Sequence, residues 1–207
     1  MIVARLSIHV SSIGTCANSI TCVLQFLNRS GWREPEAPRK PMNLYIMRHA
    51  NAGIPRENPQ LDLKRGLVKE GKEQCMQMAR LLNAMRVQVD VILSSPLKRA
   101  TQTAQLVGTE MGYEAPIEIT QALAPEAEFG DFIEMLNGYA ECDGVLVVGH
   151  NPNLFRFIGR LVAGPKGAAI RIRKGSVTHI NMATHPPRLQ WLVDPRMARS
   201  IFSALDR

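Results

Sequence analysis

Leu44-Tyr45-Ile46-Met47-Arg48-His49-Ala50-Asn51-Ala52-Gly53 joins an apolar run, typical of a buried strand, to an Arg-His pair and a turn of small residues. A second stretch, Gly144-Val145-Leu146-Val147-Val148-Gly149-His150-Asn151-Pro152, repeats this pattern and ends on another histidine. Between them, Ser94-Ser95-Pro96-Leu97-Lys98-Arg99-Ala100-Thr101-Gln102-Thr103 follows a third apolar run. In open α/β sheets, ligands bind beyond the carboxyl ends of the strands. We therefore expect these histidines and arginines to converge at one edge of a sheet.

The pattern from Met42 onward alternates strand and helix, which predicts an α/β fold with a mostly parallel central sheet flanked by helices. Strands are expected near residues 43–48, 89–94, 117–120 and 144–149. Helical spacing of apolar residues predicts helices over 67–85, 97–111, 128–140 and 152–163. Three further short strands, before a last helix from Pro195, are expected over 168–174, 177–183 and 189–193.

Composition restricts the class of protein. The chain has 207 residues, 45% hydrophobic and 21% charged, as expected of one ordinary globular domain. Its four cysteines show no CxxC spacing, which favours a reducing compartment, and we expect a cytoplasmic protein. No apolar stretch approaches the roughly 18 to 20 residues of a membrane helix, so no membrane partner is expected. Despite a formal charge of +7, no nucleic-acid-binding motif accompanies the basic residues, and no nucleic-acid partner is expected.

Residues 1–41 differ from the rest of the chain. They lack an acidic residue before Glu34 and close with the proline-rich run Glu34-Pro35-Glu36-Ala37-Pro38-Arg39-Lys40-Pro41. A targeting peptide is one interpretation, although a clear cleavage pattern is missing. We favour an N-terminal extension that is disordered or results from a mis-assigned start, followed by one domain over 42–207.

The residue types at the strand ends suit a phosphoryl group. Guanidinium groups such as those of Arg48 and Arg99 bind phosphate oxygens in a bidentate manner and stay charged. A neutral imidazole is a competent nucleophile. His49 is the better candidate nucleophile because it ends the first strand beside Arg48, whereas His150 can donate to phosphate oxygens. No carboxylate cluster typical of magnesium sites accompanies these strand ends, so we expect neither metal nor cofactor.

These three segments resemble the histidine phosphatase superfamily, and within it the SixA-type phosphohistidine phosphatases. The Arg48-His49 pair matches the superfamily's hallmark after the first strand, and the segments around Arg99 and His150 match the later motifs in order. The resemblance implies that His49 becomes phosphorylated, that Arg48, Arg99 and His150 hold the phosphate, and that water then releases it.

Two further residues enter through this resemblance. Arg65, in Lys64-Arg65-Gly66-Leu67-Val68, is similar to an Arg-Pro-Leu-Thr segment that brings another arginine to bind the phosphate. Here Gly66 and Val68 replace the proline and threonine. Other branches use a glutamate as general acid, and Glu126 is the candidate for that role in this chain.

The sequence therefore predicts a cofactor-independent phosphatase that works through a phosphohistidine intermediate, with phosphohistidine on a protein as the favoured substrate. A small phosphate ester, that is, a phosphorylated metabolite, is the alternative substrate. Two other classes stay open: a phosphate-binding interaction domain without turnover, and a basic nucleic-acid-binding module.

Overall fold

The computed structural model describes residues 42–205. The expected extension, residues 1–41, lies outside the described residues. The chain enters through β1 (Asn43–Arg48) and continues through α2 (Pro59–Leu63), α3 (Lys69–Ala84), β2 (Val91–Ser94) and α4 (Lys98–Met111). The middle of the chain forms β3 (Glu118–Ile119), η1 (Gln121–Leu123), α5 (Phe129–Asn137), β4 (Gly144–Gly149) and α6 (Asn153–Ala163). The last elements are η2 (Gly164–Lys166), β5 (Val177–Asn181), β6 (Arg188–Val193) and α7 (Pro195–Leu205).

The strands form one six-stranded sheet in the order β3-β2-β4-β1-β5-β6. Strands β1 to β4 pair in parallel, whereas β5 runs antiparallel to both β1 and β6. The predicted α/β class with a mostly parallel sheet is confirmed. Parallel pairing places the carboxyl ends of β1, β2 and β4 at the same edge, and β4 lies between the other two.

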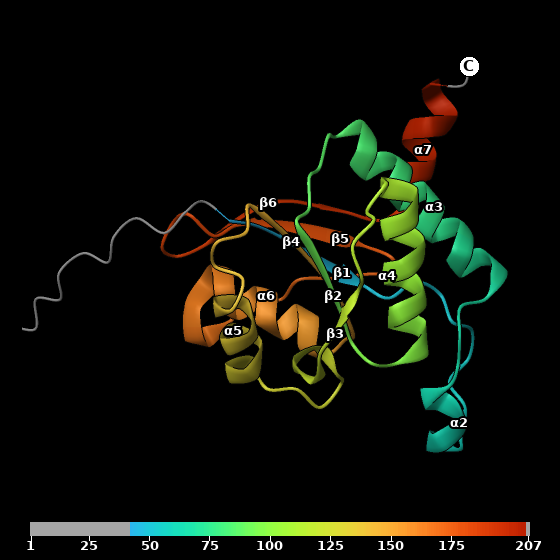
Figure 1. Ribbon diagram of the computed structural model, residues 1–207, viewed down its shortest axis with the longest axis horizontal. Helices are drawn as coiled ribbons and strands as arrows, with labels where there is room; N and C mark the ends of the chain where they lie inside the picture. The colour runs from blue at the N-terminus through green and yellow to red at the C-terminus, as the bar shows by residue number, and fades with distance from the viewer. Residues whose placement is uncertain (1–41, 206–207) are drawn as a thin grey trace, which may run out of the picture. The chain divides into compact units, whose positions relative to one another are not determined.

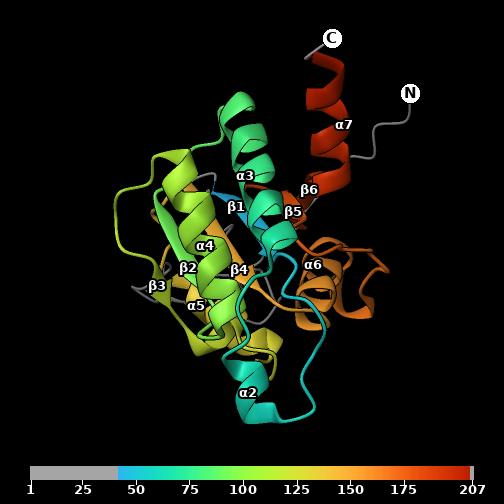
Figure 2. The same cartoon turned by 90° about the vertical axis from the view of Figure 1, so that its right-hand side faces the viewer.

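Alternation of side chains along the strands builds two cores. Tyr45 and Met47 of β1 point to one face of the sheet, where they pack with α3, α4 and α7. Leu44 and Ile46 point to the other face and pack with α5 and α6. Figures 1 and 2 show these two groups of helices on opposite sides of the sheet. Because both faces are covered, the central strands are almost continuously apolar, as the sequence of β4 illustrates.

The loop that follows β1 is held by close contacts on both sides. The amide of Ala50 donates to Thr103 Oγ1 at 3.1 Å, and that hydroxyl donates to the carbonyl of Arg99 at 2.7 Å. A Cβ at Gly71 would lie 2.0 Å from the backbone oxygen of Asn51, so glycine is required where α3 approaches this loop. These contacts fix the backbone around His49 relative to α4.

The strand predicted over 168–174 is wrong. Residues 168–173 are irregular, between Gly167 and Gly175, which both have positive φ (67° and 77°). The carbonyl of Ile172 accepts hydrogen bonds from the side chains of Arg48 and Asn151. These side chains take the place that a neighbouring strand would have. Sequence alternation in this segment therefore reflects a loop that packs one apolar residue, Ile172, and exposes Arg171. The short helix α2 was also missed, since five residues show too little helical periodicity.

Candidate active site

The two histidines singled out by sequence lie together at the carboxyl edge of the sheet. His49 directly follows β1 and His150 directly follows β4, and these strands are paired neighbours. Their ring centroids are 5.0 Å apart, and their exposed fractions are only 7% and 3%. The two imidazole rings thus lie side by side, nearly buried, where the parallel strands β1 and β4 end.

The geometry of His49 fixes its tautomer. Its Nδ1 lies 2.8 Å from the carbonyl oxygen of Ala50, and a carbonyl can only accept, so Nδ1 carries the proton. Burial lowers the pKa of His49 to about 3; the Ala50 bond opposes this shift, and the cations of Arg99, Arg48 and Lys174 add to it. His49 is therefore neutral at pH 7, and its Nε2 carries a free lone pair.

His150 is held by a hydroxyl. Its Nε2 lies 2.8 Å from Ser95 Oγ, in the residue that directly follows β2. Burial lowers the pKa of His150 to about 2, with further contributions from His49 and the nearby arginines. Its other ring nitrogen, Nδ1, is buried and has no hydrogen-bond partner among the described residues.

An acidic residue joins two of the arginines. Asp62 of α2 accepts from Arg65 Nε at 2.7 Å and from Arg99 Nη1 at 3.3 Å, and its backbone carbonyl accepts from Arg99 Nη1 at 3.1 Å. The hydrogen bond from Arg65 is the largest cause that lowers the pKa of Asp62. Arg65 also donates to the carbonyl of Ala52 at 2.8 Å. The structure thus brings Arg65 to Arg99, although Gly66 and Val68 depart from the expected segment.

Arg48 reaches the same region from the end of β1. Its Nη1 donates to the carbonyl of Ile172 at 3.0 Å, and burial lowers the pKa of its guanidinium. Within residues 42–205, Arg48 Nε and Arg99 Nε are buried without a hydrogen-bond partner, as is His150 Nδ1. Buried nitrogens without partners are rare and costly. Three of them in one cluster of cations indicate a site built to receive an acceptor-rich, anionic group.

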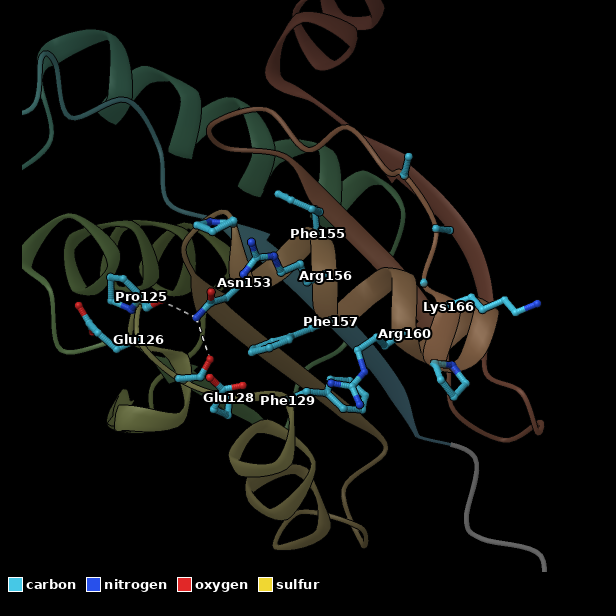
Figure 3. Close-up of a pocket in the computed structure, with 16 residues that line it drawn as sticks. Pro125, Glu126, Glu128, Phe129, Asn153, Phe155, Arg156, Phe157, Arg160 and Lys166 are labelled. Carbon is cyan, nitrogen blue, oxygen red and sulfur yellow. Dashed lines mark hydrogen bonds between the residues drawn. The ribbon is translucent and has the colours of Figure 1, made fainter.

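Glu126 lies at the edge of a separate pocket. This pocket, about 570 Å³ in volume, lies between the loop before α5 and helix α6 (Figure 3). Asn153 fixes the loop, since its side-chain amide donates to the carbonyls of Ala124, Pro125 and Ala127. The carboxylate of Glu126 is near enough to Arg99 to raise the pKa of its guanidinium, against the larger opposing effects of burial and Arg65. Glu126 thus lies at the edge of this pocket and places a negative charge near Arg99.

Sequence reasoning missed three residues of the cluster. Ser95 lies within the quoted Ser-Ser-Pro segment, but nothing in that segment shows that its hydroxyl meets His150. Asp62 precedes Arg65 by three residues, a spacing that permits an ion pair on one helical turn, whereas its contact with Arg99 spans 37 residues. Lys174 reaches the site from the loop before β5 and donates to Asn51 Oδ1 at 3.0 Å.

The described residues contain neither a metal-binding cluster nor a membrane-spanning helix. No group of three or more histidine, cysteine, aspartate or glutamate side chains in residues 42–205 is arranged to hold a metal ion. None of the helices in the described part of the chain is long and apolar enough to cross a membrane.

Comparisons with known proteins identify the family of this chain. The family model described as the histidine phosphatase superfamily (branch 1) matches residues 44–141. The phosphohistidine phosphatase SixA of Escherichia coli (strain K12) is 30% identical over 125 residues, which cover 59% of this chain and 73% of that protein. The chain belongs to the histidine phosphatase superfamily, in its SixA-type branch. An uncharacterized protein of Picosynechococcus sp. is 32% identical over 152 residues, which cover 72% of this chain and 89% of that protein.

Solved structures of the superfamily show the same fold. The structure of protein histidine phosphatase SixA complexed with tungstate superposes with a TM-score of 0.67 at 23% identity, covering 75% of this chain and 98% of that one. A putative alpha-ribazole-5'-P phosphatase from Escherichia coli superposes with a TM-score of 0.60 at 21% identity, covering 75% of this chain and 98% of the other. The fold is thus shared by proteins whose names state different substrates.

Proposed function

We propose that this protein removes phosphoryl groups through a phosphohistidine formed on His49, and that its substrate is phosphohistidine on a protein. The observation that carries the proposal is the neutral His49 ring, whose Nδ1 donates to the Ala50 carbonyl. Around it lie buried nitrogens of Arg48, Arg99 and His150 that have no hydrogen-bond partner in the described part of the chain. One nucleophilic lone pair and several donors suit an incoming phosphoryl group better than any other common ligand.

In the first step, the Nε2 lone pair of His49 forms a bond to phosphorus while the bond from phosphorus to the leaving group breaks. The charge that develops on the phosphoryl oxygens is stabilised by Arg48, Arg99 and Arg65, and by the Nδ1 proton of His150. In the second step, water attacks the phosphorus of phosphorylated His49. Inorganic phosphate leaves, the proton lost by water passes to phosphate or solvent, and the neutral imidazole is restored.

The choice of substrate rests on the leaving group. A phosphorylated histidine whose other ring nitrogen carries a proton releases a neutral imidazole, because the electron pair of the N–P bond returns to the nitrogen; imidazole is a weak base with an ordinary pKa near 6.5. An alcohol leaving group needs a stronger general acid, because an alkoxide is far more basic. Glu126 is our candidate for such an acid, and no hydrogen bond in the described residues holds it toward the two histidines. An imidazole leaving group therefore suits this site well.

The test of this function compares two substrates of the full chain. A protein carrying phosphohistidine and a chromogenic phosphate ester are each incubated with the enzyme and with the His49→Ala variant, and phosphate on histidine is followed by mass spectrometry. We expect loss of phosphate from histidine, at a higher kcat/KM than for the ester, and no loss with the variant. Cleavage of the ester alone would favour a small phosphorylated metabolite, and cleavage of neither would favour a binding domain.

Ser95 is expected to act as a positioning residue for His150. The amide of Leu97 donates to Ser95 Oγ at 3.4 Å, and the hydroxyl proton is free to point to His150 Nε2. The proton of the ring then sits on Nδ1, where it can donate to phosphate. Ser95→Ala should lower kcat by roughly 10-fold, the value of about one net hydrogen bond, with a smaller effect on KM.

Ser94 offers a matched control in the adjacent position. Its side chain is equally buried, but its hydroxyl donates to the Ser95 carbonyl and not to a histidine. Ser94→Ala should resemble Ser95→Ala in thermal stability and keep the wild-type kcat. Equal losses of kcat in the two variants would contradict the positioning role.

A further inference from the structure

We propose that a basic groove beside the phosphate pocket binds acidic residues of the phosphorylated protein substrate, an inference that rests on the function proposed above. The basic groove has a volume of about 530 Å³, and six of its eleven lining residues are cationic, against one anionic residue, Glu70. The six cations are Arg48, Arg171, Arg173, Lys174, Arg196 and Arg199.

The basic groove is continuous with the site that holds the phosphoryl group. Arg48 belongs to both, and its Nη1 donates to the carbonyl of Ile172 in the groove wall. Lys174, another lining residue, is close enough to His49 to contribute to the lowered pKa of that ring, although burial is the largest cause. A substrate whose phosphoryl group lies at His49, and whose remaining chain extends on the side of Arg48, therefore passes along the basic groove.

Much of the positive charge in the groove is uncompensated. Arg173 pairs with Asp194 at 3.2 Å, and Lys174 donates to Asn51. Arg171, Arg196 and Arg199 are exposed, and among residues 42–205 no ion pair involves their side chains. Like charges gathered without counter-charges repel one another, so this arrangement favours an anionic partner.

The start of α7 adds a second argument. Asp194 caps the helix, since its Oδ1 accepts from the amides of Arg196 and Met197 at 2.8 and 3.0 Å. The first turn contains Arg196 and no acidic residue. Cations at a helix N-terminus oppose the helix dipole, so helix stability does not explain Arg196. An acidic segment bound across Arg196 and Arg199, which lie three residues apart on one face, would relieve this repulsion.

The number of cations argues for a segment of protein. One phosphoryl group is already served by Arg48, Arg65, Arg99 and the histidines, and a simple phosphate ester brings no charge for Arg171, Arg196 and Arg199. Several carboxylates along one chain match several exposed guanidinium groups. Such contacts steer association and favour the correct partner over neutral sequences.

The test uses the full chain and two phosphohistidine peptides that differ only in glutamate or glutamine flanking residues. We expect wild type to favour the glutamate peptide by roughly 10-fold in kcat/KM, chiefly through KM, which is the effect of about three exposed ion pairs. Adding about 0.5 M salt should reduce this preference, because salt screens exposed charges. The combined variant Arg171→Ala, Arg196→Ala and Arg199→Ala should lose the preference and hydrolyse a chromogenic ester like wild type. A control variant with Arg86→Ala, Lys166→Ala and Arg188→Ala removes equal charge elsewhere and should keep the preference.

Three results would overturn the inference. They also distinguish failure of the basic groove from failure of the proposed phosphatase function. Equal kcat/KM for the two peptides with wild type would remove the groove's role and leave phosphohistidine hydrolysis intact. Equal loss of peptide and ester hydrolysis in the groove variant would place these arginines in the phosphate pocket itself. Hydrolysis of the ester and of neither peptide would overturn both the protein substrate and the groove.

Discussion

His49→Ala should lower kcat by about 10⁴-fold or more, the order of loss seen when an enzyme's nucleophile is removed. The physical reason is that no other side chain within residues 42–205 combines a free lone pair with the surrounding donors. His150, 5.0 Å away between ring centroids, is committed to Ser95 through its Nε2. Steady-state hydrolysis of a chromogenic ester measures the loss, and binding of inorganic phosphate to the variant shows that the pocket persists.

His179 supplies the control for this substitution. It is a half-buried histidine of β5 that stacks on Tyr45 with ring centroids 4.7 Å apart, and its Nε2 contacts Asn43 Oδ1. His179→Ala should cost stability and leave kcat within a few-fold of wild type. A His49→Ala variant that keeps more than about a hundredth of the activity would contradict the assignment of the nucleophile.

Arg99→Ala should lower kcat by about 10²- to 10³-fold, or about 2.7 to 4 kcal/mol of transition-state stabilisation. The loss is expected to be large for two reasons. Arg99 is almost buried, its Nε has no partner within residues 42–205, and its removal takes one of two cationic partners from Asp62, which then keeps only its ion pair with Arg65 among these residues. Arg99→Lys should recover only part of the activity, because an ammonium cannot form the two parallel bonds of a guanidinium.

Arg80 is a suitable control for Arg99. Its guanidinium extends from α3 to lie 4.2 Å from the ring centroid of Phe202 on α7, and it takes no part in the cluster. Arg80→Ala should change thermal stability without changing kcat. If Arg99→Ala instead raises KM at constant kcat, Arg99 binds the ground state and transition state equally, and its proposed role in stabilising the transition state is wrong.

Local patterns in the sequence predicted the parts of the fold that depend on local physics. The apolar runs that become β1 and β4 match the predicted bounds, because strands buried on both faces are continuously apolar. The strand predicted over 168–174 was wrong. Isoleucine and arginine alternate there in a loop, and side chains donate to the carbonyl of Ile172 in that loop. Periodicity cannot distinguish an exposed strand from such a loop.

The candidate site divides in the same way. Arg48, His49 and His150 could be found because each lies at the end of an apolar strand. Asp62 could not, since its contact with Arg99 depends on how α2 folds against α4 across 37 residues. Likewise, the basic groove joins a loop and α7, and the charges of Arg171 and Arg199 become neighbours only in the folded chain.

The most direct test is to locate the phosphoryl group on the enzyme during turnover. A chromogenic ester is hydrolysed by the full chain, the reaction is quenched within milliseconds in alkali, and the modified residue is mapped by mass spectrometry and phosphorus NMR. The structure predicts one phosphoryl group on His49 at Nε2, because Nδ1 is bound to the Ala50 carbonyl at 2.8 Å. A phosphoryl group at Nδ1, on His150 or on any other residue would contradict the proposed mechanism, as would normal turnover without a covalent intermediate.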